Sequence, residues 1–187
     1  MKKNDAIAWL DSLEITDYEI IENSKYEVVI NVNNNVDLSS KGLKTIEYKF
    51  GIIKGFFNCN YNLLQSLENA PDIVHGNFSC STNTLNSLFG APNKINGYFD
   101  CTNNKIKNLQ YCPSTVQGDF YANHNEINVL NLNDLPTTLL GKIYIHKNNI
   151  PAFWQNIHSI DVLRSLLEQQ LLNQSINTII KGKNYKL

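Results

Sequence analysis

"GNFSCSTNTLNSLFGAP", residues 76–92, is followed 21 residues later by "GYFDCTNNKIKNLQYCP", residues 97–113. Both segments place a glycine, a phenylalanine, a cysteine, an asparagine, two aliphatic residues and a proline at the same relative positions. The same frame begins again at Gly55 and Gly118, and a 23-residue step then leads to Gly141. Repetition at a nearly constant period predicts an array of stacked structural units.

The repeated positions form columns when the copies are aligned on their glycines. The columns are Phe57, Phe78, Phe99, Phe120 and Ile143; Cys59, Cys80, Cys101, Ala122 and Ile145; Asn62, Asn83, Asn104, Asn125 and Asn148; Leu64, Leu85, Ile106, Ile127 and Ile150; Leu67, Leu88, Leu109, Leu130 and Phe153; and Pro71, Pro92, Pro113 and Pro136. A degenerate first copy starts at Asn34, with Val36, Leu38, Leu43 and Ile46 in its apolar positions.

The spacing of the first two columns predicts a strand. The phenylalanine and cysteine positions are two residues apart, so both side chains point to one side of an extended segment. A strand with two inward side chains cannot cover its own apolar side, so the copies must stack in parallel, about 4.8 Å apart. Proline favours an extended, non-helical return to the next copy. Asparagine at a tight corner can bond the backbone of its own and the neighbouring turn, which predicts an asparagine ladder.

The segments on either side of the array predict structures that close its ends. Residues 1–33 read as an N-terminal cap, with a helix capped by Asn4 or Asp5 and then the hairpin "YEII", "ENSK", "YEVVINV". The array itself is expected over residues 34–150. Residues 151–187 read as a C-terminal helical cap and tail, with one short helix after Pro151 and a second one capped by Ser159. The inward side chains predicted for these helices are Ile7, Trp9, Leu10 and Leu13, and Ile160, Leu163, Leu166, Leu167 and Leu171. The tail "NQSINTIIKGKNYKL" leaves a last helix, a strand and a frayed end open.

The core pattern F-x-C-x-x-N-x-L-x-x-L is similar to the leucine-rich repeat, with phenylalanine and cysteine in the first two apolar places. The segments at 55–71 and 76–92, and the N-terminal segment "WLDSLEITDYEI", resemble the short leucine-rich repeat proteins encoded by tailed bacteriophages. The resemblance implies an α/β solenoid of horseshoe shape with one short parallel strand per repeat, a phage origin, and action in the cytoplasm of the bacterial host. It implies no characterised activity. Ala122, Ile145 and the longer segment 130–140 depart from the pattern, and a bulge is expected there.

Composition argues against several classes of partner. The 16 Lys and Arg residues balance 17 Asp and Glu residues, so no general attraction for nucleic acid is expected. No run of 18 apolar residues is present, and Asp5, Asp11 and Glu14 interrupt any signal-peptide core, so we expect no membrane association. Free cysteines are typical of a reducing cytosol.

The cysteines and histidines are the candidate metal ligands and redox-active residues of the sequence. Three cysteines share a column with Leu38, Ala122 and Ile145, and Cys112 shares one with Ala70 and Ala91, so we interpret all four as small core residues. His124 and His146 nearly align on successive copies, which leaves a metal-binding or titrating pair as an alternative to a surface-exposed pair. No nucleophile elbow, phosphate loop or His-Glu-x-x-His motif is present. We therefore predict neither an enzyme nor a cofactor.

The outward residues of the predicted strands form the candidate binding surface. Repeat arrays present a long, continuous face of this kind, the concave face of a horseshoe. Aromatic side chains stand there at positions that packing does not require, and such residues commonly anchor protein interfaces. The alternative is that tyrosine simply suits a strand. The predicted protein-binding residues are Phe56, Tyr61, Tyr98, Asp100, Asp119, Tyr121, His124, Tyr144 and His146.

The leading hypothesis from the sequence is a non-catalytic protein-protein interaction module, in the form of a phage protein that binds and inhibits a bacterial host or defence protein. One alternative is a structural component of the virion or its assembly. The least favoured alternative is a metal-dependent enzyme around His124 and His146. The sequence does not predict the partner's identity or the oligomeric state.

Overall fold

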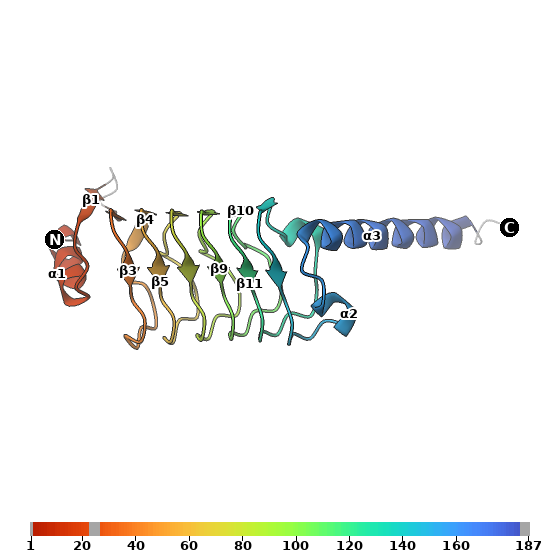
Figure 1. Ribbon diagram of the computed structural model, residues 1–187, viewed down its shortest axis with the longest axis horizontal. Helices are drawn as coiled ribbons and strands as arrows, with labels where there is room; N and C mark the ends of the chain where they lie inside the picture. Colours follow the sequence, from red (N-terminus) through yellow and green to blue (C-terminus); the bar gives the residue numbers. More distant parts are fainter. Residues whose placement is uncertain (1, 23–26, 184–187) are drawn as a thin grey trace.

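The chain is a solenoid. A computed structural model describes residues 2–22 and 27–183, and its successive turns stand side by side along one long axis (Figure 1). The described residues form two sheets that run the length of the array, one of six strands and one of seven, and the first two strands of the second sheet precede the repeats. The predicted solenoid of stacked parallel strands is therefore confirmed.

The six-stranded sheet contains the phenylalanine column. Its strands are β3 (Val36–Asp37), β5 (Phe57–Asn58), β7 (Phe78–Ser79), β9 (Phe99–Asp100), β11 (Phe120–Tyr121) and β13 (Ile143–Tyr144). Neighbouring strands are parallel and in register, so that Phe78 lies opposite Phe99 and Phe99 lies opposite Phe120. Residues that are equivalent in the sequence repeat are thus neighbours in space.

A second sheet lines the return side of each turn, and the prediction of one strand per repeat was wrong. Its strands are β1 (Tyr18–Glu22), β2 (Val28–Val32), β4 (Lys49–Ile53), β6 (Ile73–Val74), β8 (Lys94–Ile95), β10 (Thr115–Val116) and β12 (Thr138–Leu139). The segment that follows each proline is extended, as expected, but it also bonds the next turn. For example, the Asn96 N–H donates to the Val74 carbonyl at 3.0 Å. Val74 and Ile95 point into the core, so these returns are half-buried strands.

The core is a column of stacked aromatic rings flanked by small and aliphatic residues. The rings of Phe57 and Phe78 have centroids 5.5 Å apart, and those of Phe78 and Phe99 are 5.7 Å apart. The phenylalanine and cysteine columns are fully buried, as predicted. Because each ring contacts only the turns beside it, the array is held together by nearest-neighbour packing.

The asparagine ladder is confirmed, and each rung joins two turns. The Asn104 amide nitrogen donates to the Cys101 carbonyl of its own turn and to the Cys80 carbonyl of the preceding turn, both at 3.1 Å. Its amide oxygen accepts the Leu85 N–H at 3.0 Å. Equivalent contacts recur along the ladder, so each corner satisfies backbone groups that are removed from water.

The residue before each ladder asparagine, and Ser40 before Lys41 in the degenerate first copy, have a left-handed backbone. This column contains no glycine, and its φ values lie between 54° and 58°. This conformation costs a non-glycine residue about 1–2 kcal/mol, so the backbone is strained at this corner of every turn. Its members are Ser40, Tyr61, Thr82, Asn103, His124 and Lys147.

A helix and a hairpin stand at the N-terminal end of the array. The helix α1 (Lys2–Ser12) begins before Asn4 and Asp5, so the prediction that one of them caps it was wrong. The Trp9 ring lies 5.9 Å from the Phe50 ring, which is part of the core. β1 and β2 pair in antiparallel fashion and confirm the hairpin, whereas its turn falls on residues 23–26, outside the described residues.

Three helical segments follow the strand β11 in the part of the chain that the structure describes. The longer repeat contains the 3₁₀ helix η1 (Leu132–Asp134), so the inserted residues form a turn of helix where a bulge was predicted. The helix α2 (Ala152–Gln155) follows Pro151, and α3 (Ile160–Lys183) follows Ser159.

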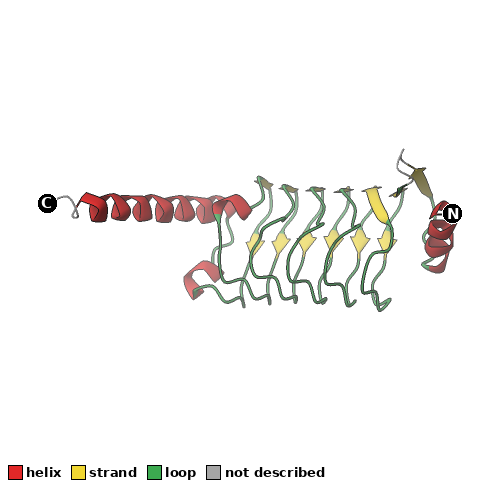
Figure 2. Cartoon of the chain, turned by 180° about the vertical axis from the view of Figure 1, so that it is seen from behind, coloured by secondary structure: helices red, strands yellow, loops and turns green. Residues whose placement is uncertain are grey.

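The long helix α3 is anchored by its first turns. Leu163 and Leu167 are buried, and the Arg164 guanidinium donates to the Pro136 and Thr137 carbonyls. Leu171, predicted to face inward, is 51% exposed, so that prediction was wrong. The C-terminal part of α3 projects beyond the array (Figure 2). The tail segment from Asn173, for which the sequence left a helix, a strand and a frayed end as alternatives, is helical through Lys183. None of the helices in the described ranges combines the length and apolarity needed to cross a bilayer.

Candidate functional site

The outer side of the six-stranded sheet presents three columns of side chains, which we call the six-stranded face. Its residues alternate with the buried phenylalanine and cysteine columns, because successive side chains of a strand point to opposite sides. The columns are Asn35, Phe56, Asn77, Tyr98, Asp119 and Lys142; Asp37, Asn58, Ser79, Asp100, Tyr121 and Tyr144; and Ser39, Asn60, Ser81, Thr102, Asn123 and His146.

Large and small side chains alternate along the first of these columns. The Asn77 amide oxygen accepts the Tyr98 N–H at 3.0 Å, and an Asp119 carboxylate oxygen accepts the Lys142 N–H at 2.8 Å. Asn35 accepts the Phe56 N–H in the same way at 3.0 Å. These short side chains lie down against the backbone of the next turn, so every second turn lacks a bulky group in this column.

A hollow lies where Asn77 folds down between two aromatic residues. It has a volume of about 190 Å³, and Phe56 and Tyr98 are among the residues that line it. Polar side chains line it as well, and Ser79 is 6% exposed. The full lining is Phe56, Phe57, Asn58, Asn60, Asn77, Ser79 and Tyr98.

A continuous row of aromatic rings occupies the C-terminal half of the six-stranded face. The Tyr98 and Tyr121 rings are 6.1 Å apart and perpendicular, and the Tyr121 and Tyr144 rings stack at 5.0 Å. His158 extends the row, with its ring 5.0 Å from that of Tyr144. The structure therefore brings together three of the predicted tyrosines and adds a histidine.

Two members of the aromatic row make polar contacts, Tyr121 with the side chain of Asp119 and His158 with the backbone of Ile143. The Tyr121 hydroxyl donates to the Asp119 carboxylate at 2.9 Å. This hydrogen bond, reinforced by partial burial, raises the pKa of Tyr121 to about 12. His158 Nδ1 donates to the Ile143 carbonyl at 3.1 Å, and the Ile143 N–H donates to the His158 carbonyl at 3.0 Å. The rings of Tyr121 and His158 are thus held in fixed positions.

His124 and His146 are neighbours, as their near alignment predicted. Their ring centroids are 6.0 Å apart and the ring planes are inclined by 71°. Partial burial, together with the positive charges that His124 and Lys147 can carry, lowers the pKa of His146. Within the described residues, no group of three or more His, Cys, Asp or Glu side chains is placed to hold a metal ion.

The nine predicted residues do not form one cluster. Tyr61 and His124 belong to the left-handed corner beside the strands, and Tyr61 is 63% exposed. Phe56 borders the hollow near the N-terminal end of the face, whereas Tyr144 and His146 lie on its last strand or directly after it. The prediction therefore describes an elongated surface.

The cysteines contribute packing. Cys59, Cys80 and Cys101 are fully buried, and burial raises the pKa of each thiol. Cys112 is half-buried, and its thiol donates to the Asp134 carbonyl at 3.1 Å. Burial first, and the Asp134 carboxylate second, raise the pKa of Cys112 to about 12. A thiol with such a pKa is a poor nucleophile at neutral pH.

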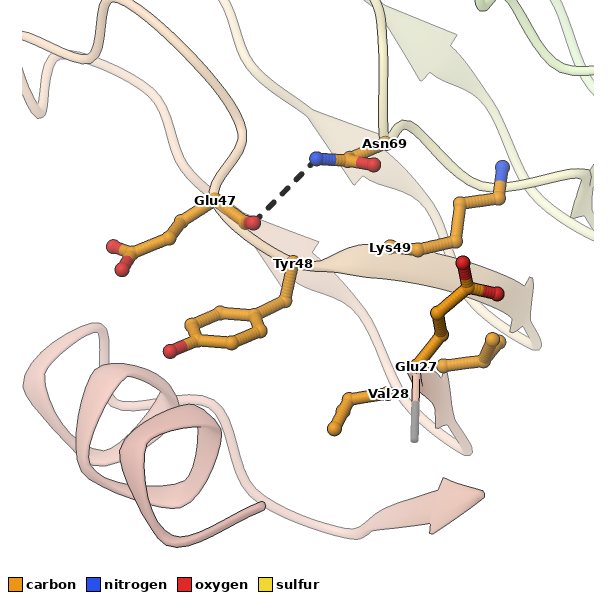
Figure 3. Close-up of a pocket in the computed structure, with 7 residues that line it drawn as sticks. Glu27, Val28, Glu47, Tyr48, Lys49 and Asn69 are labelled. Carbon is orange, nitrogen blue, oxygen red and sulfur yellow. Dashed lines mark hydrogen bonds between the residues drawn. The ribbon is translucent and has the colours of Figure 1, made fainter. Parts of the chain in front are cut away.

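A second, larger hollow of about 560 Å³ lies near the hairpin, at the N-terminal end of the seven-stranded sheet (Figure 3). Tyr48 and Asn69 line it, and the Asn69 amide nitrogen lies 3.4 Å from the Glu47 carbonyl. Lys49 also lines it and forms an ion pair with Asp72 at 2.7 Å. None of the nine predicted binding residues borders this hollow.

Sequence reasoning missed two features of the face. His158 lies outside the repeat, so no periodic signal links it to Tyr144. The repeat pattern did not predict that the Asn77 side chain lies against the backbone of Tyr98. In this column Asn35, Asn77 and Asp119 alternate with bulky residues.

Comparison with protein-family models, with curated proteins and with solved structures gave no match.

Proposed function

We propose that the chain is a non-catalytic protein-binding module that holds a partner protein on its six-stranded face. The observation that supports this most is the row Tyr98, Tyr121, Tyr144 and His158, whose rings contact one another on the outside of the array. Rigid, amphipathic rings of this kind bury a large contact area at low entropic cost, and they are typical anchors of interfaces.

The rigidity of the face supports the same proposal. The Asn104 side chain joins two turns through four contacts with backbone atoms, and the rings beneath the face stack in register. A preorganised surface loses little freedom when a partner docks, so more of the contact energy contributes to affinity.

The resemblance to phage leucine-rich repeat proteins supports a more specific version. In this version, the protein acts in the cytoplasm of a bacterial host, where it binds and inhibits a host or defence protein. The array is then a leucine-rich-repeat horseshoe, α1 and the β1–β2 hairpin cap one end, and the C-terminal helices cap the other. The contact between Trp9 and Phe50 and the burial of Leu163 and Leu167 support the caps.

A pull-down with purified protein tests the face assignment. Wild type, a Tyr98→Ala/Tyr121→Ala/Tyr144→Ala variant and a Phe89→Ala/Tyr111→Ala control are immobilised and exposed to lysate of the native host. Phe89 and Tyr111 are also exposed aromatic residues in mutual contact, but they lie outside the six-stranded face. We expect a partner that wild type and the control recover and the triple variant does not. Equal recovery by all three would refute the assignment.

Two other functions have distinct readouts. A structural role in the virion requires the chain to be present in purified particles, which mass spectrometry detects. A metal-dependent enzyme requires stoichiometric metal in the purified protein, lost in a His124→Ala/His146→Ala variant.

A further inference from the structure

The hollow between Phe56 and Tyr98 has a defined shape. The two residues stand two turns apart, which at about 4.8 Å per turn separates their backbones by about 9.6 Å. Asn77, on the turn between them, is folded down against the backbone of Tyr98. A flat group midway between the two side chains would lie about 4.8 Å from each, inside the roughly 6 Å range of cation–π contacts. The spacing therefore allows one planar group to lie within cation–π range of both side chains.

The polar lining of this hollow offers unused hydrogen-bonding groups. The Ser79 hydroxyl donates to the Asn60 amide oxygen at 2.7 Å, and that oxygen also accepts the Ser81 N–H at 2.6 Å. The amide nitrogens of Asn60 and Asn77 have no partner among the described residues. Asp100 lies beside Ser79, with a carboxylate oxygen 3.4 Å from the Ser79 hydroxyl.

The charge of Asp100 is not neutralised. One of its oxygens accepts the Thr102 N–H at 2.9 Å, while the single Ser79 proton is committed to the shorter bond with Asn60. Among the described residues, ion pairs join Lys49 to Asp72 and Arg164 to Asp161, and neither involves the six-stranded face. Ahead of Lys142, the three columns of this face carry Asp37, Asp100 and Asp119 and no lysine or arginine.

From this arrangement we infer that the partner inserts an arginine side chain between Phe56 and Tyr98, with its guanidinium on the Asp100 carboxylate. Guanidinium is the planar cation of proteins: it stacks on aromatic faces and pairs with carboxylates through a fixed fork of donors. Lysine offers a compact charge that cannot fill a flat slot. The inference rests on the proposed function, since it names the chemistry of the partner on the same face.

A titration followed by NMR tests the inference with defined probes. The ¹⁵N-labelled protein receives capped arginine, capped citrulline or capped lysine, each as the N-acetyl, N-methylamide derivative. Citrulline keeps the planar shape and loses the charge, whereas lysine keeps the charge and loses the shape. Saturable shifts are expected for arginine in the side-chain amides of Asn60 and Asn77, with a dissociation constant of about 1–10 mM. Lysine and citrulline should each bind about tenfold more weakly.

Variants assign the contacts. Asp100→Asn should weaken arginine binding about tenfold, and Phe56→Leu or Tyr98→Leu about fivefold. Asp72→Asn removes a carboxylate on the seven-stranded side and should leave the affinity unchanged. The dispersion of each variant's spectrum verifies its fold.

The inference would be overturned by equal binding of arginine and lysine, or by arginine binding that persists in Asp100→Asn. Chemical-shift changes confined to residues outside the hollow would also overturn it. Saturable binding of a neutral sugar such as maltose, with none of arginine, would overturn it too and assign the hollow to a carbohydrate. These results are independent of the pull-down: a partner lost on tyrosine substitution but retained by Asp100→Asn would preserve the proposed function and reject the arginine.

Discussion

The Asn104 amide oxygen lies 3.0 Å from the backbone nitrogen of Leu85, one turn earlier in the solenoid. The same side chain donates to the carbonyl of Cys80 in that turn and to the carbonyls of Cys101 and Thr102 in its own. One buried side chain therefore satisfies backbone groups of two turns, and the stability of the array depends on it.

Asn104→Ala should lower the free energy of unfolding by about 3 kcal/mol, because it leaves a buried N–H and buried carbonyls without partners. Urea unfolding monitored by circular dichroism measures the change. Asn86→Ala, at an exposed position in the preceding repeat, should alter stability by less than about 0.5 kcal/mol. Equal losses in the two variants would show that the ladder is not a principal source of stability.

The left-handed corner predicts a stabilising substitution. Thr82 has φ 54°, a conformation that is particularly unfavourable for a β-branched residue. Thr82→Asn should raise the free energy of unfolding by about 0.5–1 kcal/mol, because asparagine tolerates this conformation. Thr45→Asn, at an exposed position without positive φ, is the matched control and should be neutral. A destabilised Thr82→Asn protein would contradict the assignment of strain to this corner.

Close approach, and not backbone conformation, requires glycine at position 97. A Cβ atom there would overlap the Asn77 amide oxygen and come within 2.8 Å of the Gly76 carbonyl oxygen. Gly97→Ala should cost about 3 kcal/mol in thermal or urea unfolding. Gly42 has φ 69° but open space around it, so Gly42→Ala should cost only about 1 kcal/mol. The interpretation fails if Gly42→Ala proves the more damaging substitution.

The raised pKa of Cys112 predicts a loss of stability at alkaline pH. A thiol in the unfolded chain ionises near pH 9, whereas Cys112 in the folded chain stays protonated up to about 12. Between these values the unfolded state binds fewer protons, so this contribution to stability falls by about 1.4 kcal/mol per pH unit. Cys112→Ala should show a shallower decline between pH 9 and 11 than wild type. Parallel curves would mean that the thiol ionises equally in both states.

The sequence predicted the repetitive part of the fold because each column has one physical role. Phe78 and Phe99 are buried and stacked, and Asn83 and Asn104 bridge turns, as their spacing indicated. Most of the second sheet was missed because its repeat strands β6, β8, β10 and β12 are two residues long, and only one residue of each, such as Val74, is buried. So short a pattern resembles any extended segment.

The candidate site was predictable in position but not in shape. Alternation placed Tyr98, Tyr121 and Tyr144 on one face, and their rings do contact one another. The Asn77 side chain lies against the backbone because it accepts a hydrogen bond from the Tyr98 N–H. The period of the repeat does not predict this side-chain conformation. His158 joins the row through a segment outside the repeat, so only the packing of the chain end brings it there.

Docking of a partner protein on the six-stranded face can be tested by site-specific photo-crosslinking. A photoreactive phenylalanine analogue replaces Tyr98, Tyr121 or, as the control outside this face, the exposed Tyr111, and the protein is illuminated in its native cells. We predict that Tyr98 and Tyr121 positions yield the same covalent adduct with a partner protein and that the Tyr111 position does not. Adducts formed only at Tyr111, or at none of the three positions, would contradict docking on the six-stranded face.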